Sequence, residues 1–130
     1  EAKKIGNEYY CMMDHGRENS NKKVFNWLQE LTKYDPGEII INSIDNDGME
    51  NGFDKELSKI VESVNFKCSK VISGGAGNLD HFYQILKEFK FEGISLATLL
   101  HFNKIKINDL KQYLLKKKIN INFNDTNWNN

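Results

Sequence analysis

The feature of this sequence that most constrains its fold begins near residue 38. From there on, short apolar runs alternate with amphipathic segments. The runs Glu38–Ile41, Val71-Ile72 and Gly93–Ala97 each have the composition of a strand, and a segment with helical apolar spacing follows each. Strands that alternate with helices through short connections form parallel sheets with right-handed crossovers. The sequence therefore predicts an α/β fold. Because Glu38–Ile41 is rich in β-branched residues, we expect this strand to be buried on both faces.

The helices that follow these strands have recognisable start signals. Asp54 precedes Leu57 and further apolar residues at helical spacing, so it is a candidate N-cap. Asn78 is placed in the same way before the next helix, and Asn108 or Asp109 begins the last one. That last helix is expected to end in a run of lysines at 116–118, where positive charge is favourable to the helix dipole.

The segment before the first parallel strand predicts a hairpin and a helix. Gly6-Asn7 separates two runs of strand-forming residues within Lys4–Met13, which is typical of a β-hairpin. A polar loop is expected over Asp14–Ser20, followed by an amphipathic helix over Asn21–Lys33 that Pro36-Gly37 terminates.

Composition excludes several classes of function. The chain has 130 residues, enough for one domain, and its 18 basic and 18 acidic residues give a formal net charge of zero. A neutral chain lacks the positive charge expected of a protein that binds nucleic acid or an anionic membrane surface. No apolar run approaches the length of a membrane span, and the two cysteines form no disulfide framework, so we expect a cytoplasmic protein. We expect a domain over residues 1–121 and a frayed tail over 122–130.

A glycine cluster after the second parallel strand is the most informative candidate site. Gly74, Gly75 and Gly77 lie at a strand-to-helix turn, where they allow a ligand to approach backbone N–H groups closely. The next strand ends in Ala97-Thr98, which supplies a small residue and a hydroxyl. Ligands of parallel α/β folds bind at the carboxyl ends of the strands, so these residues predict a phosphate site. A tight turn selected only for its geometry is the alternative.

Asp45 and Asp47 follow the first parallel strand and form a second candidate site. Carboxylates at the mouth of a site act as acid or base, or bind sugar hydroxyls. The alternative is an Asx-turn that caps the loop before Gly48. The three histidines lie on different predicted elements without ligand spacing, so we expect no metal site, and nothing implies a cofactor.

Four motifs together resemble the cyclase subunit of imidazole glycerol phosphate synthase (HisF). They are Gly37–Gly48, Gly52–Asp54, Ser73–Gly77 and His101-Phe102, and they have the order and spacing of that family. The resemblance extends from Ala2 to about Ile121. It implies the C-terminal half of a (β/α)8 TIM barrel, with parallel strands and a β-hairpin at the N-terminus.

The resemblance also implies a reaction and partners. The family accepts ammonia from a glutaminase subunit and adds it to a bis-phosphorylated ribulosyl aminoimidazole nucleotide. It then cyclises and cleaves the product to form imidazole glycerol phosphate, a step of histidine biosynthesis. The match places Asp47 in the active-site mouth and Glu38 at a charged gate on the ammonia path. The residues implied to hold the substrate phosphate are Gly48, Gly75, Ala97 and Thr98, with Gly74 and Gly77 beside them.

Three positions depart from the family pattern. Glu1 occupies the position of a catalytic aspartate, and its extra methylene moves the carboxyl outward. Asn42 and Met49 each stand where the synthase usually has threonine. Asn42–Asp45 looks more like paralogues found with surface-sugar genes, which deliver ammonia to a separate amidotransferase. We therefore take Glu1 and Asp47 as candidate catalytic residues, and Asn42 and Asp45 as candidate substrate contacts.

Three functions remain open from the sequence. The first is the synthase cyclase, and the second is a paralogue that conducts ammonia to an amidotransferase. The third is a half-barrel that binds phosphate without catalysis. The family's other catalytic aspartate belongs to the half that the resemblance does not cover, so activity is expected to require that half-barrel or a second copy of the chain.

Overall fold

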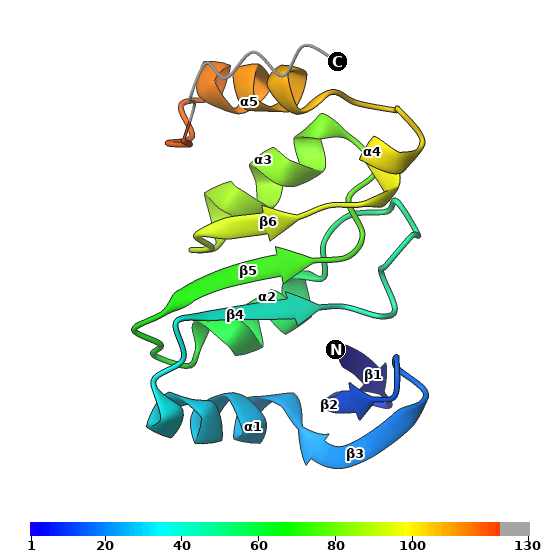
Figure 1. Ribbon diagram of the computed structural model, residues 1–130, viewed down its shortest axis with the longest axis vertical. Coiled ribbons are helices and arrows are strands. Elements are labelled where there is room, and N and C mark those ends of the chain that lie inside the picture. Colours follow the sequence, from blue (N-terminus) through cyan, green and yellow to red (C-terminus); the bar gives the residue numbers. More distant parts are fainter. Residues whose placement is uncertain (123–130) are drawn as a thin grey trace.

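The protein comprises two small sheets and several helices, and a computed structural model describes its residues 1–122 (Figure 1). An antiparallel sheet in the order β1-β2-β3 comprises Ala2–Ile5, Glu8–Met13 and Glu18–Lys23. A parallel sheet in the order β4-β5-β6 comprises Glu38–Asn42, Ser69–Ser73 and Gly93–Ser95. The helices are α1 (Val24–Leu31), the 3-10 turn η1 (Thr32–Tyr34), α2 (Lys55–Glu62), α3 (Leu79–Glu88), α4 (Thr98–His101) and α5 (Ile107–Lys116).

The parallel sheet confirms the predicted α/β class. One face of it lies on α2 and α3 (Figure 1), and Ile39, Ile41 and Ile72 are buried in the core cluster that these helices complete. The other face is open, and the side chain of Ile40 is 62% exposed. The prediction that this strand is buried on both faces is therefore wrong, because the described helices cover one face alone.

The predicted hairpin is confirmed, but the polar loop expected after it is confined to residues 14–17. Gly6 supplies the positive φ of 63° at the turn between β1 and β2. Residues 18–23 form β3, which pairs with β2, so the expected loop is shorter and α1 begins at Val24 instead of Asn21. The side chain of Ser20 donates to the Cys11 carbonyl at 2.7 Å. Strand β3 gave no apolar alternation because most of its side chains are exposed.

Two helix starts behave as predicted. The Asp54 carboxylate accepts from the Leu57 N–H at 2.9 Å, and the Asn78 side chain accepts from the His81 N–H at 3.1 Å. Helix α5 begins at Ile107, slightly earlier than expected.

The third parallel strand is shorter than the sequence suggested. It ends at Ser95, and Thr98 is the first residue of α4 instead of a strand end. The carbonyl of Ala97 accepts from the N–H groups of Leu100 and His101, which starts the helical turn at that point.

The two sheets meet at the carboxyl end of β4. Ala2 and Ser43 form an isolated parallel bridge, and the Ile44 N–H donates to the Ala2 carbonyl at 2.9 Å. The Lys4 N–H donates to the Asp45 carboxylate at 2.7 Å. These bonds fix the hairpin beside the loop that follows β4.

A buried carboxylate strengthens this junction. Asp54 accepts from the Tyr9 hydroxyl at 2.9 Å and from the Ser43 hydroxyl at 3.1 Å, and all three residues are buried. Burial raises the pKa of the Tyr9 hydroxyl well above its usual range, and the hydrogen bond to Asp54 adds to this effect. The group therefore joins the hairpin, the end of β4 and the start of α2.

Within residues 1–122, every helix is too short or too polar to traverse a bilayer. The predicted frayed tail, apart from Asn122, lies outside the described residues.

We predict that Tyr9→Phe lowers the free energy of unfolding by about 1–3 kcal/mol, because it removes a donor from a buried carboxylate. Since the pKa of Tyr9 is raised in the folded state, its stabilising effect is complete below about pH 10 and declines above that value. The difference from wild type should therefore shrink above pH ~10 in chemical denaturation. Tyr10→Phe is the matched control, and equal losses in both variants would contradict the prediction.

Candidate functional site

A cavity of about 110 Å³ lies at the carboxyl ends of β4, β5 and β6. Its wall is formed by the last residues of the strands and by the loops that follow them. The lining residues are Asn42, Asp47, Gly48, Ser73, Gly74, Gly75, Ala76, Ser95, Leu96, Ala97, Thr98 and Leu99. Most of the candidate substrate contacts from the sequence are therefore gathered in one place.

One side of the cavity presents backbone donors. In residues 1–122, the N–H groups of Gly75, Ala76 and Thr98 have no protein acceptor. Thr98, whose side chain carries a hydroxyl, lines the same cavity. Clustered N–H groups in a glycine-rich turn are suited to an anion.

The glycines of this side are required by loop packing. A Cβ at Gly75 would lie 2.1 Å from the Gly52 carbonyl oxygen, and a Cβ at Gly77 would lie 1.9 Å from that of Glu50. The Gly52 N–H also donates to the Gly75 carbonyl at 2.7 Å. Gly77 does not line the cavity, and its N–H donates to His81 Nδ1 at 3.0 Å. For Gly77, the interpretation as a tight turn selected for its geometry is therefore sufficient.

Asn42 and Asp47 contribute polar side chains to the same cavity. The Asn42 side-chain nitrogen donates to Oδ2 of Asp47 at 3.4 Å. The Asn42 Oδ1 atom is screened from solvent and has no hydrogen-bond partner. Asp47 is the one charged residue in the lining, so the cavity has no cationic side chain among its described residues.

The remaining candidates lie elsewhere. Asp45 is outside the lining and accepts from the Lys4 backbone. Glu38 is exposed at the amino end of β4, away from the cavity. Glu1 lines a separate cavity of about 170 Å³ between β4, the hairpin and α1. The structure therefore brings Asn42 and Asp47 together but does not place Glu1 in the same cavity.

Sequence reasoning missed part of the wall. Ser95 and Leu96 line the cavity, although no motif marked them, and their position at the end of a predicted strand was the available signal.

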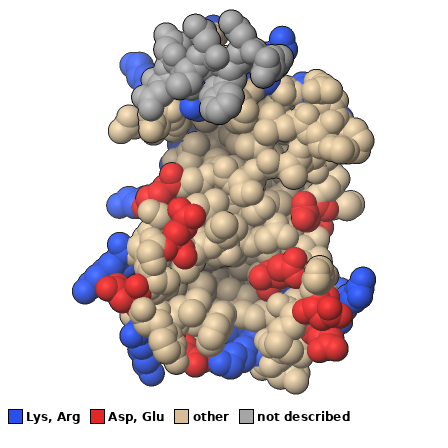
Figure 2. Space-filling model, in the orientation of Figure 1, with Lys and Arg blue, Asp and Glu red and all other residues tan. Residues whose placement is uncertain are grey.

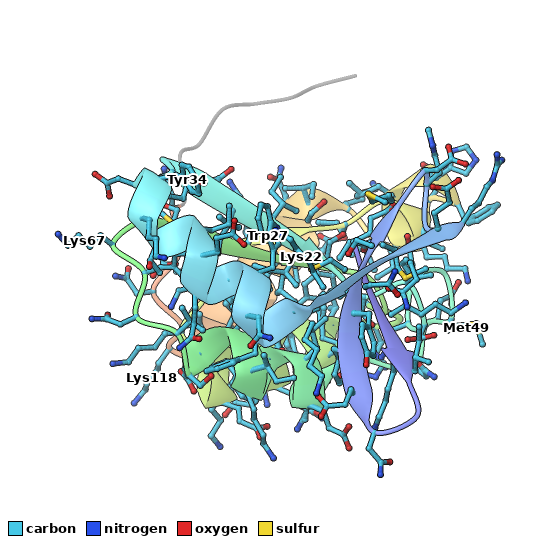
Figure 3. The ribbon with its side chains drawn as sticks, turned by 90° about the horizontal axis from the view of Figure 1, so that it is seen from below. Lys22, Trp27, Tyr34, Met49, Lys67 and Lys118 are labelled. Atoms are coloured by element: carbon cyan, nitrogen blue, oxygen red, sulfur yellow. The ribbon has the colours of Figure 1, made fainter. Side chains whose placement is uncertain are left out.

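Met49 is 62% exposed in the loop after β4, at the opposite end of the molecule from Tyr34 and Lys67 (Figure 3).

Comparison with known proteins decides the family. A model described as histidine biosynthesis protein matches residues 1–106. The chain belongs to this family. Its members have the TIM-barrel fold, of which the alternating β4–α5 segment is a part, so the predicted fold class is confirmed.

Three relatives carry the name imidazole glycerol phosphate synthase subunit HisF. The protein of Prochlorococcus marinus (strain MIT 9515) is 36% identical over 122 residues, which cover 93% of this chain and 47% of the relative. The Campylobacter concisus protein is 38% identical over 114 residues, covering 88% and 44%. The Nostoc protein is 40% identical over 105 residues, covering 80% and 40%. The chain thus spans about half the length of these relatives and matches their C-terminal half, as the motifs indicated.

We predict that Gly75→Ala lowers the free energy of unfolding by more than about 2 kcal/mol, because its Cβ meets a carbonyl oxygen and its φ is positive. Gly48→Ala is the matched control, since Gly48 also has a positive φ but open space around its Cβ position. It should cost about 1–2 kcal/mol. Equal costs in thermal unfolding would show that loop packing does not fix Gly75.

Proposed function

We propose that this chain forms the C-terminal half of a HisF-type cyclase subunit of imidazole glycerol phosphate synthase, and that its cavity holds a phosphate group of the substrate. The observation that carries the proposal is the group of N–H donors without protein acceptors at the carboxyl ends of β5 and β6. Phosphate oxygens are acceptors and match such donors. The names of the relatives support the choice of reaction.

The binding residues follow from the lining. Gly74 and Gly75 allow the phosphate to approach the backbone, and Ala97 leaves room beside them. The Thr98 hydroxyl adds a side-chain donor. Gly48 also lines the cavity, where the lack of a side chain leaves room for the ligand.

The proposed chemistry uses two carboxylates as acid and base. Asp47 lies in the cavity wall, beside the expected phosphate position. Glu1 precedes the Ala2–Ser43 bridge, so it is near the carboxyl end of β4. We propose that the two act on the substrate from different sides. The ring closure and cleavage both need protons to be moved at such positions.

The proposal includes partners that supply what this half lacks. A glutaminase subunit supplies ammonia, and Glu38 at the amino end of β4 is placed to gate its passage. The other half-barrel, or a second copy of the chain, covers the open face of the parallel sheet, on which Ile40 is exposed. Asp45 remains a candidate substrate contact through the oxygen that does not bind Lys4.

We predict that inorganic phosphate shifts the amide resonances of Gly75, Ala76 and Thr98 most. Thr98→Val should weaken binding by about tenfold, because it removes one donor to a charged group and keeps the side-chain shape. Thr32→Val is the control, since Thr32 lies in η1, which does not contribute to the cavity. Uniform or absent shifts would contradict the proposed site.

We predict that Asp47→Asn in the full-length enzyme lowers turnover with ammonium salt at least ~100-fold, because general acid–base catalysis contributes about that much. Glu1→Gln should have a comparable effect, whereas Glu1→Asp should retain activity. Asp35→Asn, after η1, is the control for the loss of one carboxylate. Full turnover in the Asp47→Asn variant would show that Asp47 has no catalytic role and serves only in the turn.

A further inference from the structure

The cavity has an unusual charge balance for a phosphate site. Its lining residues include one carboxylate, Asp47, and no lysine, arginine or histidine. The edge toward which the strands point shows acidic side chains more prominently than basic ones (Figure 2). Phosphate and a carboxylate repel each other at short range, so a neighbouring group must reduce that repulsion.

The carboxamide of Asn42 is held in one orientation beside this carboxylate. Its nitrogen lies 3.4 Å from Oδ2 of Asp47. Its oxygen is directed toward Gly74, where a Cβ would come within 3.0 Å of it. The reversed orientation would place the amide oxygen against the carboxylate, acceptor against acceptor, and is therefore disfavoured.

This orientation of the Asn42 carboxamide leaves one of its polar atoms without a hydrogen bond. The Asn42 Oδ1 atom is buried and accepts no hydrogen bond. An unsatisfied buried acceptor destabilises the folded state, and a residue without that oxygen would avoid the penalty. The useful end of the side chain is therefore its NH2 group. Since Oδ1 is screened from solvent, the NH2 group is the end of the amide that can face the cavity.

Other polar groups near this strand end are already engaged. The Ser43 hydroxyl donates to Asp54, and the Asn46 amide donates to the Gly52 carbonyl at 2.8 Å. Asn42 has two N–H hydrogens, and Asp47 accepts one of them. Of the three asparagines in residues 42–54, Asn42 is the one that lines the cavity, so its second amide hydrogen is placed to reach a ligand there.

We propose that Asn42 is a specificity-determining residue, whose NH2 group donates one hydrogen to Asp47 and the other to a phosphate oxygen of the ligand. It thereby allows an anionic ligand and the Asp47 carboxylate to occupy one small cavity. The inference rests on the proposed function, because it requires that the cavity binds phosphate.

A double-mutant cycle with inorganic phosphate tests the coupling between the two side chains. We expect Asn42→Leu to weaken phosphate binding at least about tenfold in the wild-type background, because a donor is lost and the carboxylate is left bare. Asp47→Asn should strengthen binding. In that background Asn42→Leu should cost only about threefold, since one direct hydrogen bond remains to be lost.

Equal factors for Asn42→Leu in the two backgrounds, or no effect in either, would overturn the inference while leaving the phosphate site intact. An absence of phosphate binding in the wild-type protein would overturn the proposed site and this inference together. Asn51→Leu, in the same loop but outside the lining, is the matched control and should bind as wild type does. If Asn42→Leu does not fold, Asn42→Asp serves instead. It should bind phosphate more weakly than wild type, and unchanged binding would overturn the inference.

Discussion

The buried carboxylate of Asp54 is the interaction on which the arrangement of this molecule depends. It accepts hydrogen bonds from Tyr9 on the hairpin, from Ser43 just after β4 and from the Leu57 N–H at the start of α2. A buried carboxylate without such donors would be strongly destabilising, so the three elements are held to one another by the same charge. The positions of the hairpin and of the loop after β4 are therefore linked.

This junction also determines the geometry of the cavity. The loop that begins at Ser43 and ends at Asp54 carries Asp47 and packs against the glycine turn after β5. Its backbone comes so close that Gly75 and Gly77 have no room for a side chain. The two loops that carry the N–H donors and Asp47 are thus held against each other by these close contacts.

Much of the fold was predictable because its signals are local. The caps at Asp54 and Asn78, the hairpin turn at Gly6 and the alternation of strands and helices all depend on neighbouring residues. Strand β3 was not predictable in this way, since Glu18–Lys23 is polar and becomes a strand only through pairing with β2. The exposure of Ile40 has a similar origin, because the covering of a sheet face depends on distant parts of a chain.

In the candidate site, too, the local features were predictable and the contacts between side chains were not. Gly74, Gly75 and Thr98 were found from their positions relative to the predicted strands, and they do line one cavity, whereas Gly77 does not. The hydrogen bond between Asn42 and Asp47 was not predictable, since it depends on the rotamers of two side chains five residues apart on a turn. Tyr9 carried no signal of its bond to Asp54, because the partners lie on separate elements.

Binding and catalysis have different structural requirements in such a cavity. Neutral backbone donors can hold a phosphate without a cation, which leaves Asp47 as the one charged side chain in the described lining. A lysine or arginine beside that carboxylate would form an ion pair with it, and the described lining contains neither residue. A neutral amide such as Asn42 donates a hydrogen bond to the carboxylate without placing a second charge beside it. The absence of cations from the described lining is thus consistent with one cavity that serves both purposes.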